Sequence, residues 1–287
     1  LIARRVLDAV DEEVGAGKVS ISLGFIGVQP SSYPINTIFL WTSGPHEAVL
    51  RIALKPGSGV STPTLQERLR RRLPEIAPGT QVTFEAADLI SQAMSFGAPT
   101  PVEIAVTGPN LAANRTYADK ALGELKRVPS LRDLQIGELL EYPTLNVKVD
   151  RERAGQLGLT MRDVGRSVVP ATSSSRFTEA NYWADPATGI SYQVQVEVPQ
   201  LRVSSAEDLA NVPVTLGGAP RPLLGDVATV TPGTTVGEYH RLNMQRAVTL
   251  TANIAGQDLK SAGEAVQTAL RRAGEPPRGS RVVVRGQ

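Results

Sequence analysis

The sequence has 287 residues, 41% of them hydrophobic, which is enough for about two domains with apolar cores. Because it contains no cysteine, disulfides, thiolate metal sites and cysteine nucleophiles are all excluded. Thirty basic and 28 acidic residues give a net charge of +2, which lacks the positive excess expected of a protein that binds nucleic acid.

Residues 1–86 carry helical and extended patterns in turn. Apolar residues recur at helical spacing from Ile2 to Val14, and alternation marks a strand from Val19 to Phe25. A ferredoxin-like unit would begin with one strand more, before Leu1, so we expect this unit to lack its first strand. The pattern predicts, in order, a helix over 2–14, strands over 19–25 and 48–54, a helix that is capped by Ser61 and buries Leu65, Leu69 and Leu73, and a strand over 81–86.

Two βαβ-type segments with matching patterns lie far apart, at 102–149 and 247–285. Each begins with alternating apolar residues, continues into an amphipathic helical stripe and returns to an extended pattern. Helices over one face of a small, largely antiparallel sheet suit a ferredoxin-like plan. We therefore expect Ala247–Arg285 to fold beside Val102–Ile136, as one split domain that carries an insertion.

The stretch between these segments, about 150–239, has a different pattern of apolar and polar residues. Thr160 and Asp163 form a capping pattern before a short helix, and Ser205 and Asp208 form another. A polar, turn-prone run over 172–189 is expected to be an arm, a lid or a contact surface, because long polar connections are otherwise uncommon. Extended patterns follow over 190–196, 212–216 and 222–230.

Four motifs, in this order, resemble the resistance-nodulation-division (RND) efflux pumps. The stretch Asp88–Val102 is similar to the crossover between the two porter subdomains of these pumps, and Tyr142–Val164 to the passage from porter to docking subdomain. Pro222–Val230 resembles the end of the docking insert, and Tyr239–Arg246 the re-entry into the second porter unit. The similarity covers essentially the whole sequence.

The resemblance implies an α+β fold with two ferredoxin-like, split-βαβ porter subdomains, the second interrupted by an α+β docking subdomain. The implied divisions are a first porter subdomain at 1–97, the two halves of the second at 98–142 and 239–287, and the docking insert at 143–238. This arrangement is that of the second large periplasmic loop of a proton-driven inner-membrane exporter. No run approaches the roughly 18 apolar residues of a spanning helix, so the family's proton-carrying carboxylates lie outside this sequence.

The resemblance also implies partners. These are the other protomers of a trimeric pump, a periplasmic adaptor protein, an outer-membrane channel and a small-molecule cargo. Neither enzymatic activity nor a cofactor is expected, and nucleic acid is not an expected partner.

Such pumps capture cargo in a cleft between porter subdomains, and strand parity selects the side chains that would face it. Where Val82 and Phe84 pack under the helices, Thr83 and Glu85 face the other side of the sheet. The same parity holds for the other strands, and the crossover contributes hinge residues. The candidate cleft residues are Ser22, Thr83, Glu85, Gln92, Met94, Phe96, Glu103 and Thr251, with Ser20 and Thr249 on the same faces. The alternative is that the crossover residues only fill the interface and the polar strand residues meet water.

Two other surfaces are candidates for assembly. The arm would contact a neighbouring protomer or a docking partner through Arg176, Phe177, Tyr182 and Trp183. In the corresponding alternative hypothesis, the chain is a structural module for trimer or adaptor contact and has no ligand site of its own. The cluster Arg68, Arg70, Arg71 and Arg72 predicts a solvated helix face, with contact to an adaptor or a lipid headgroup as the alternative.

The sequence also bears on the class of cargo. Heavy-metal members of the family use a cluster of cleft methionines, because soft thioethers suit copper(I) and similar ions. Here Met94, Met161 and Met244 fall in three separate segments, and the last two are expected to be packing residues. His46 and His240 have acidic residues only as sequence neighbours, so we expect them to face solvent or to bond locally. An organic or amphiphilic cargo, as in multidrug resistance, is favoured, with the heavy-metal branch as the alternative.

Overall fold

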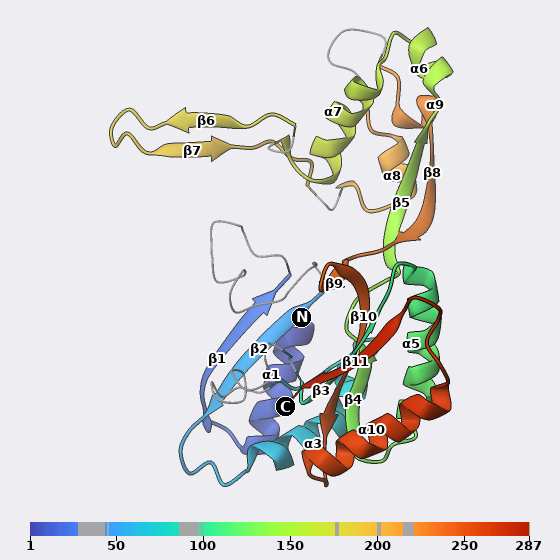
Figure 1. Ribbon diagram of the computed structural model, residues 1–287. Helices are drawn as coiled ribbons and strands as arrows, with labels where there is room; N and C mark the ends of the chain where they lie inside the picture. Colours follow the sequence, from blue (N-terminus) through green and yellow to red (C-terminus); the bar gives the residue numbers. More distant parts are fainter. Residues whose placement is uncertain are drawn as a thin grey trace. The chain divides into compact units, whose positions relative to one another are not determined.

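The computed structural model describes residues 1–27, 44, 46–85, 98, 100–175, 178–199, 202–214 and 221–286. The chain divides into two compact units (Figure 1). One unit joins Leu1–Leu140 to Val236–Gln287, and the other is the insert, Glu141–Thr235. Within the first unit we call residues 1–85 the N-terminal subdomain, and residues 100–140 with 236–286 the second subdomain. Across the described ranges, no helix is long and apolar enough to cross a membrane.

The N-terminal subdomain places two helices against a two-stranded antiparallel sheet. Its elements are α1 (Ile2–Val14), β1 (Val19–Ile26), β2 (Ala48–Leu54) and α3 (Thr62–Ile76). The side chain of Ser61 accepts a hydrogen bond from the backbone N–H of Thr64 at 3.3 Å, so the predicted helix cap is confirmed. The buried core comes from the predicted helix faces, namely Ala9, Val10 and Val14 of α1 and Leu65, Leu69 and Leu73 of α3.

Two expectations for this subdomain are wrong. Residues 81–85 have no regular structure, whereas a strand was predicted over 81–86. In the split-βαβ order the last strand pairs with the first, and the described chain has no strand before α1, so the segment finds no strand partner there. The sheet is narrow for the same reason. The predicted parity of β1 is also wrong. A register shift between Val19 and Ile21 places Ser22 opposite Ile52, which packs against the core, so Ile21 and Leu23 lie on the other face of the sheet and are exposed.

The second subdomain has the complete ferredoxin-like order. Its elements are β3 (Val102–Thr107), α5 (Leu111–Leu125), β4 (Leu131–Ile136), β9 (His240–Leu242), β10 (Gln245–Ile254), α10 (Leu259–Ala273) and β11 (Arg281–Gly286). The strand order is β11-β3-β10-β4, so strands from the two sides of the insert alternate in one antiparallel sheet. Ile104 of β3, for example, lies opposite Leu250 of β10 and Val284 of β11. The predicted split domain is confirmed.

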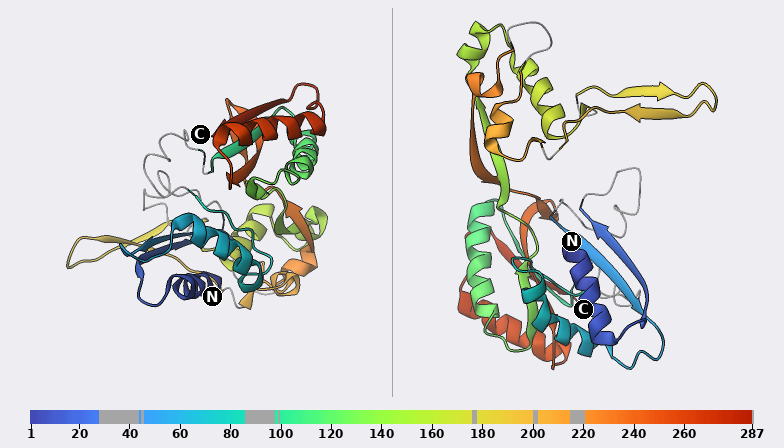
Figure 2. Two further views of the ribbon diagram at one scale, coloured as in Figure 1. Left: turned by 90° about the horizontal axis from the view of Figure 1, so that it is seen from below. Right: turned by 180° about the vertical axis from the view of Figure 1, so that it is seen from behind.

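Helices α5 and α10 cover one face of this sheet (Figure 2). Their apolar stripes meet the inward-facing residues of the strands in a single core. That core includes Ile104, Val106, Ala118, Ala121, Leu125, Val248, Leu250, Val266 and Ala269. It shares no residue with the core of the N-terminal subdomain, so the two subdomains are held by separate hydrophobic clusters.

The insert packs short helices beside a two-stranded sheet. Its elements are β5 (Tyr142–Val149), α6 (Arg151–Gln156), α7 (Met161–Thr172), β6 (Asn181–Ala184), β7 (Ser191–Val194), α8 (Ala206–Ala210), α9 (Leu224–Val227) and β8 (Ala228–Thr235). Strand β5 pairs with β8, and β6 pairs with β7 in a separate hairpin. The capping boxes of Thr160 with Asp163 and of Ser205 with Asp208 are both present, as predicted.

The extended pattern predicted over 222–230 is wrong in its first half. Helix α9 forms there because Leu224 and Val227, three positions apart, are both fully buried in the core of the insert. The carboxylate of Asp226 accepts the N–H of Leu223 at 2.8 Å, which supports this short helix. The strand expected over 212–216 is reduced to a single bridge between Pro213 and Leu223, and residues 215 and 216 lie outside the described ranges.

The turn between β9 and β10 is strained. Leu242 pairs with Gln245, so Asn243 and Met244 form a two-residue hairpin turn, with φ of 49° and 67°. Such turns favour asparagine followed by glycine, because a residue with a Cβ is disfavoured at positive φ. Met244 is 88% exposed and Met161 is also exposed, so the expectation that both are packing residues is wrong.

This strain gives a first prediction. Replacing Met244 with glycine is expected to raise the free energy of unfolding by about 0.5–1 kcal/mol, since the relief of left-handed strain exceeds the added chain entropy of glycine. Chemical denaturation of Met244→Gly beside Met244→Ala measures this, because alanine keeps the strain and removes the side chain. Equal stabilities of the two variants would contradict the assignment of strain.

Candidate functional site

The polar residues that parity assigns to a cleft meet at the sheet face of the second subdomain that α5 and α10 leave uncovered. Glu103 of β3 and Thr251 of β10 are opposite each other in register, and both are buried. Thr83 of the N-terminal subdomain accepts a hydrogen bond of 3.3 Å from Asn253 of β10. The alternative that these strand residues meet water is therefore wrong for Glu103, Thr249 and Thr251. Ser22 and Glu85 are exposed on the N-terminal subdomain, and Gln92, Met94 and Phe96, like Arg176 and Phe177 of the arm, lie outside the described residues.

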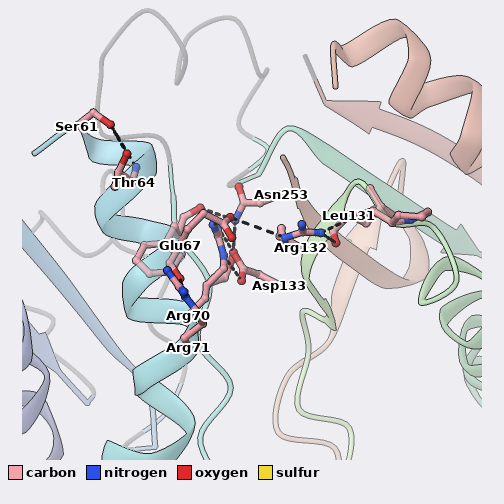
Figure 3. Close-up of polar contacts among 12 residues, drawn as sticks. Ser61, Thr64, Glu67, Arg70, Arg71, Leu131, Arg132, Asp133 and Asn253 are labelled. Atoms are coloured by element: carbon pink, nitrogen blue, oxygen red, sulfur yellow. Dashed lines mark hydrogen bonds and ion pairs between the residues drawn. The ribbon is translucent and has the colours of Figure 1, made fainter. Parts of the chain in front are cut away.

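Three side chains, which we call the seam network, join the two subdomains (Figure 3). Arg70 of α3 donates to Asp133 of β4 through Nε to Oδ1 at 2.8 Å and through Nη2 to Oδ2 at 2.6 Å. The third member, Asn253, donates from Nδ2 to Oδ2 of Asp133 and to the carbonyl oxygen of Phe84, each at 2.8 Å. The Arg70 guanidinium also lies over the Phe84 ring, 4.8 Å from its centroid. The network thus binds α3 and the segment after it to both β4 and β10.

Asp133 is aimed at its partners by an irregular backbone. Its φ is 53°, a value that few residues other than glycine adopt, and the pairing of β10 with β4 shifts register between Thr251 and Asn253. The side chains of Arg70 and Asp133 are only 15% and 6% exposed. A strained backbone that presents a buried carboxylate to two donors indicates that the contact of Asp133 with Arg70 and Asn253 has a functional role.

The arginine cluster of α3 forms the predicted solvated face only in part, because Arg68 and Arg71 are exposed whereas Arg70 and Arg72 are partly buried. Arg70 is the member that faces the second subdomain. Arg68 and Arg72 form ion pairs with Glu13 of α1, at 3.7 Å and 3.0 Å, and Arg72 also pairs with Glu12. Arg70 also pairs with Glu67 of its own helix at 2.7 Å. Helix-face reasoning missed the other contacts because Glu12, Glu13 and Asp133 lie about 60 residues away in sequence.

Glu103 forms a buried ion pair on the uncovered sheet face. Its Oε1 lies 3.1 Å from Nε of Arg285, which is its register partner on β11. Burial raises the pKa of Glu103, and the positive charge of Arg285 acts in the opposite direction. On the other side Glu103 faces Thr251, so arginine, carboxylate and hydroxyl follow one another across three strands.

A second polar chain lies where the insert leaves and re-enters the second subdomain. The fully buried Glu138 accepts the backbone N–H of Thr249 at 2.8 Å, at the point where β4 ends beside β10. Its other oxygen lies 3.1 Å from Nδ1 of His240, and Nε2 of His240 lies 3.4 Å from Glu238. Hydrogen bonding to Glu138, and then to Glu238, raises the pKa of His240 to about 10. We predicted that His240 faces solvent or bonds to residues near it in sequence. That prediction did not include Glu138, which is distant in sequence.

The AcrB/AcrD/AcrF family model matches residues 37–287. The chain belongs to this family. The assignment to RND transporters that rested on four sequence motifs is therefore confirmed.

Curated relatives of this AcrB/AcrD/AcrF family member include metal-resistance proteins. The cobalt-zinc-cadmium resistance protein CzcA of Cupriavidus metallidurans is 25% identical over 193 residues, which are 64% of this chain and 17% of CzcA. The nickel-cobalt-cadmium resistance protein NccA of Alcaligenes xylosoxydans xylosoxydans is 25% identical over 73% of this chain and 20% of its own length. Protein HelA of Legionella pneumophila is 23% identical over 69% of this chain. The chain thus spans about a fifth of the length of these relatives.

Solved structures share the fold of this family member. The crystal structure of a heavy metal efflux pump, in two crystal forms, matches all of this chain with a TM-score of 0.76 at 20% identity, over 30% and 29% of that pump's chain. The predicted fold class, two porter-like subdomains with an insertion in the second, is confirmed by this match.

The charged groups of the site are already paired within this AcrB/AcrD/AcrF chain. Glu103 is paired with Arg285, and Glu138 with His240. In the parts of the chain that the structure describes, no three His, Asp or Glu side chains are grouped so that they could hold a metal ion. These paired groups can therefore fix the orientation of the strands that carry them, and they can recognise a ligand through hydrogen bonds and charge.

Proposed function

We propose that this chain is the cargo-capturing and docking portion of a proton-driven RND efflux pump. In this proposal it lies on the periplasmic side of the inner membrane, in a trimeric pump that works with an adaptor protein and an outer-membrane channel. The observation that carries the proposal is the family match over 37–287. The names of the curated relatives, which describe resistance and cation efflux, support it. The chain then acts by binding and assembly, and no enzymatic step is assigned to it.

Within this proposal, cargo passes between the N-terminal and second subdomains. The contact of Thr83 with Asn253 supports this path, because it brings the N-terminal subdomain to the sheet face that carries Glu103 and Thr251. Glu85 lies two residues after Thr83 and is exposed, although desolvation by the surrounding protein raises the pKa of its carboxyl group, against the opposing effect of Arg51. Ser22, Gln92, Met94 and Phe96 are assigned to the same path on sequence grounds alone.

The proposed divisions are those of the family. Residues 1–97 would be the first porter subdomain, 98–142 and 239–287 the halves of the second, and 143–238 the docking insert. The compact insert at Glu141–Thr235 supports these limits to within a few residues.

The cargo we propose is an organic or amphiphilic compound. Two observations support this class. The carboxylates of the polar face are held by Arg285 and His240, so they are not free to ligate a metal ion. Met161 and Met244 lie at the start of α7 and at the β9–β10 turn, on different units of the chain. The competing candidate is a divalent metal cation, which the names of CzcA and NccA favour.

Resistance assays separate the two classes of cargo. The full-length transporter that contains this chain would be expressed in a host that lacks its own efflux pumps. We expect tolerance of amphiphilic dyes and detergents to rise while tolerance of zinc, cobalt and cadmium salts stays at the level of the empty vector. A rise for the metal salts alone would overturn the organic assignment, and no rise for either class would overturn the efflux proposal.

A second candidate function, a pure assembly module, is favoured by the β6–β7 hairpin. Tyr182 and Trp183 of β6 are 67% and 52% exposed, and Trp183 pairs with Tyr192 of β7 at 6.2 Å between ring centroids. A two-stranded hairpin with exposed aromatic residues is marginal in water, so a partner surface would stabilise it. If the chain is an assembly module, Trp183→Ser in the full-length protein should prevent assembly. Substitutions of Glu85 or Glu103 should then leave export unchanged.

A further inference from the structure

The seam network, beside a longer ion pair of 3.8 Å between Arg132 of β4 and Glu67 of α3, connects two subdomains whose apolar cores are separate. Every residue of one core lies before Glu85 and every residue of the other lies after Thr100. Interfaces of this kind open without exposing an apolar core to water, so relative motion is the default expectation for them. The polar contacts therefore set the balance between the closed and the open arrangement.

The chemistry of the network suits a reversible contact. When the seam is closed, the Arg70–Asp133 ion pair is nearly withdrawn from water, and the loss of hydration offsets much of the attraction between its charges. When the seam is open, Asp133 regains water and Arg70 keeps its ion pair with Glu67 of the same helix. Two parallel N–H···O contacts fix the orientation of the closed state, which a single lysine contact would not do.

The position of the network connects it to the polar face. Asn253 lies two residues after Thr251 on β10, so both side chains point to the same side of the sheet. Thr251 in turn faces Glu103. Separation of α3 and Thr83 from Asp133 and Asn253 would therefore uncover the surface on which the cargo path is proposed.

We propose that Arg70, Asp133 and Asn253 form a closure device that holds the N-terminal subdomain against the second subdomain and must open for cargo to enter. The role in cargo entry rests on the proposed function. The closure itself can be measured on the chain without a transport assay. The three residues act as positioning residues, since none of them is assigned to contact cargo.

The absence of cysteine from the sequence allows a direct test. Spin labels at Glu75→Cys on α3 and Lys120→Cys on α5, both exposed positions, would report the distance between the subdomains by pulsed electron paramagnetic resonance. Two variants remove the network in different ways. Arg70→Gln deletes the cation, and Asp133→Gly deletes the carboxylate while it relieves the positive φ, so that folding is not impaired. Arg71→Gln is the matched control, because the adjacent arginine is exposed and donates to the carbonyl oxygen of Glu67 in its own helix.

We expect Arg70→Gln and Asp133→Gly each to raise the ratio of open to closed populations by about tenfold or more, the change that corresponds to loss of about 1.4 kcal/mol. Arg71→Gln should keep the wild-type distance distribution. Unchanged distances in both network variants would overturn the proposal. The role in cargo entry would be overturned if Asp133→Gly lengthened the distances but the full-length transporter with this substitution exported cargo as well as the wild type. If the wild-type transporter exports nothing, the proposed function fails, and the distances still decide whether the network closes the seam.

Discussion

Replacement of His240 by glutamine is expected to lower the free energy of unfolding by about 2 kcal/mol at pH 7. The reason is that the fully buried carboxyl group of Glu138 would lose its cationic partner. Removal of one partner from a buried pair costs about 3–5 kcal/mol, and the half-exposed His240 side chain reduces that figure through solvent screening. Chemical denaturation measures the loss, and Glu138→Gln in the same background should restore part of it.

The same substitution should change the pH dependence of stability. The pKa of His240 is raised in the folded state from 6.5 to about 10, so its contribution is complete below pH 6.5 and is lost as pH rises to about 10. The difference in stability between the wild type and His240→Gln should therefore shrink across this range. Glu238→Gln is the control, because it removes the longer contact of 3.4 Å to His240 and leaves the contact with Glu138 in place. A difference that stays constant from pH 6.5 to 10 would show that the ion pair with Glu138 does not form.

Leu250→Ala is expected to destabilise the second subdomain by about 3–4 kcal/mol. Leu250 lies in β10, after the insert, and is fully buried against residues from β3 and α5, which precede the insert. A cavity there should reduce hydrogen-exchange protection in β3 as much as in β10, because both strands belong to one cooperative core. Hydrogen exchange with mass spectrometry resolves the two segments.

The matched control for this prediction lies in the insert. Val214 is also fully buried, but it belongs to the separate core of that unit. Val214→Ala should lower protection in β5 and β8 and leave β3 and β10 unchanged. If Leu250→Ala left the protection of β3 intact, the strands on the two sides of the insert would not share a core.

Local signals accounted for much of the fold. The caps at Ser61, Thr160 and Ser205 were predictable because a capping side chain bonds within three residues of itself. The split domain was predictable because its two segments carry the same periodicity. A strand over 81–86 was not a safe prediction, since strand formation needs a neighbour that periodicity does not supply. Helix α9 was missed because only the packing of Leu224 and Val227 selects it.

The site was less accessible from the sequence. Parity placed Thr83, Glu103 and Thr251 on the side of the sheets away from the helices, and the contact of Thr83 with Asn253 agrees with that face. Parity does not reveal what covers a face, so the burial of Glu103 was missed. The contacts of Arg70 with Asp133 and of Glu138 with His240 join residues 63 and more positions apart.

The role in cargo binding stays a prediction for every candidate residue, and the export spectrum of the full-length transporter tests it most directly. Glu85→Gln and Phe96→Ala would be compared with the wild type over a panel of amphiphilic compounds. Glu75→Gln, an exposed acidic position on α3, is the control. We predict that the two cleft variants change which compounds are exported while expression and the control spectrum stay at wild-type levels. Identical spectra for all four proteins would contradict the account and favour a purely structural role for this chain.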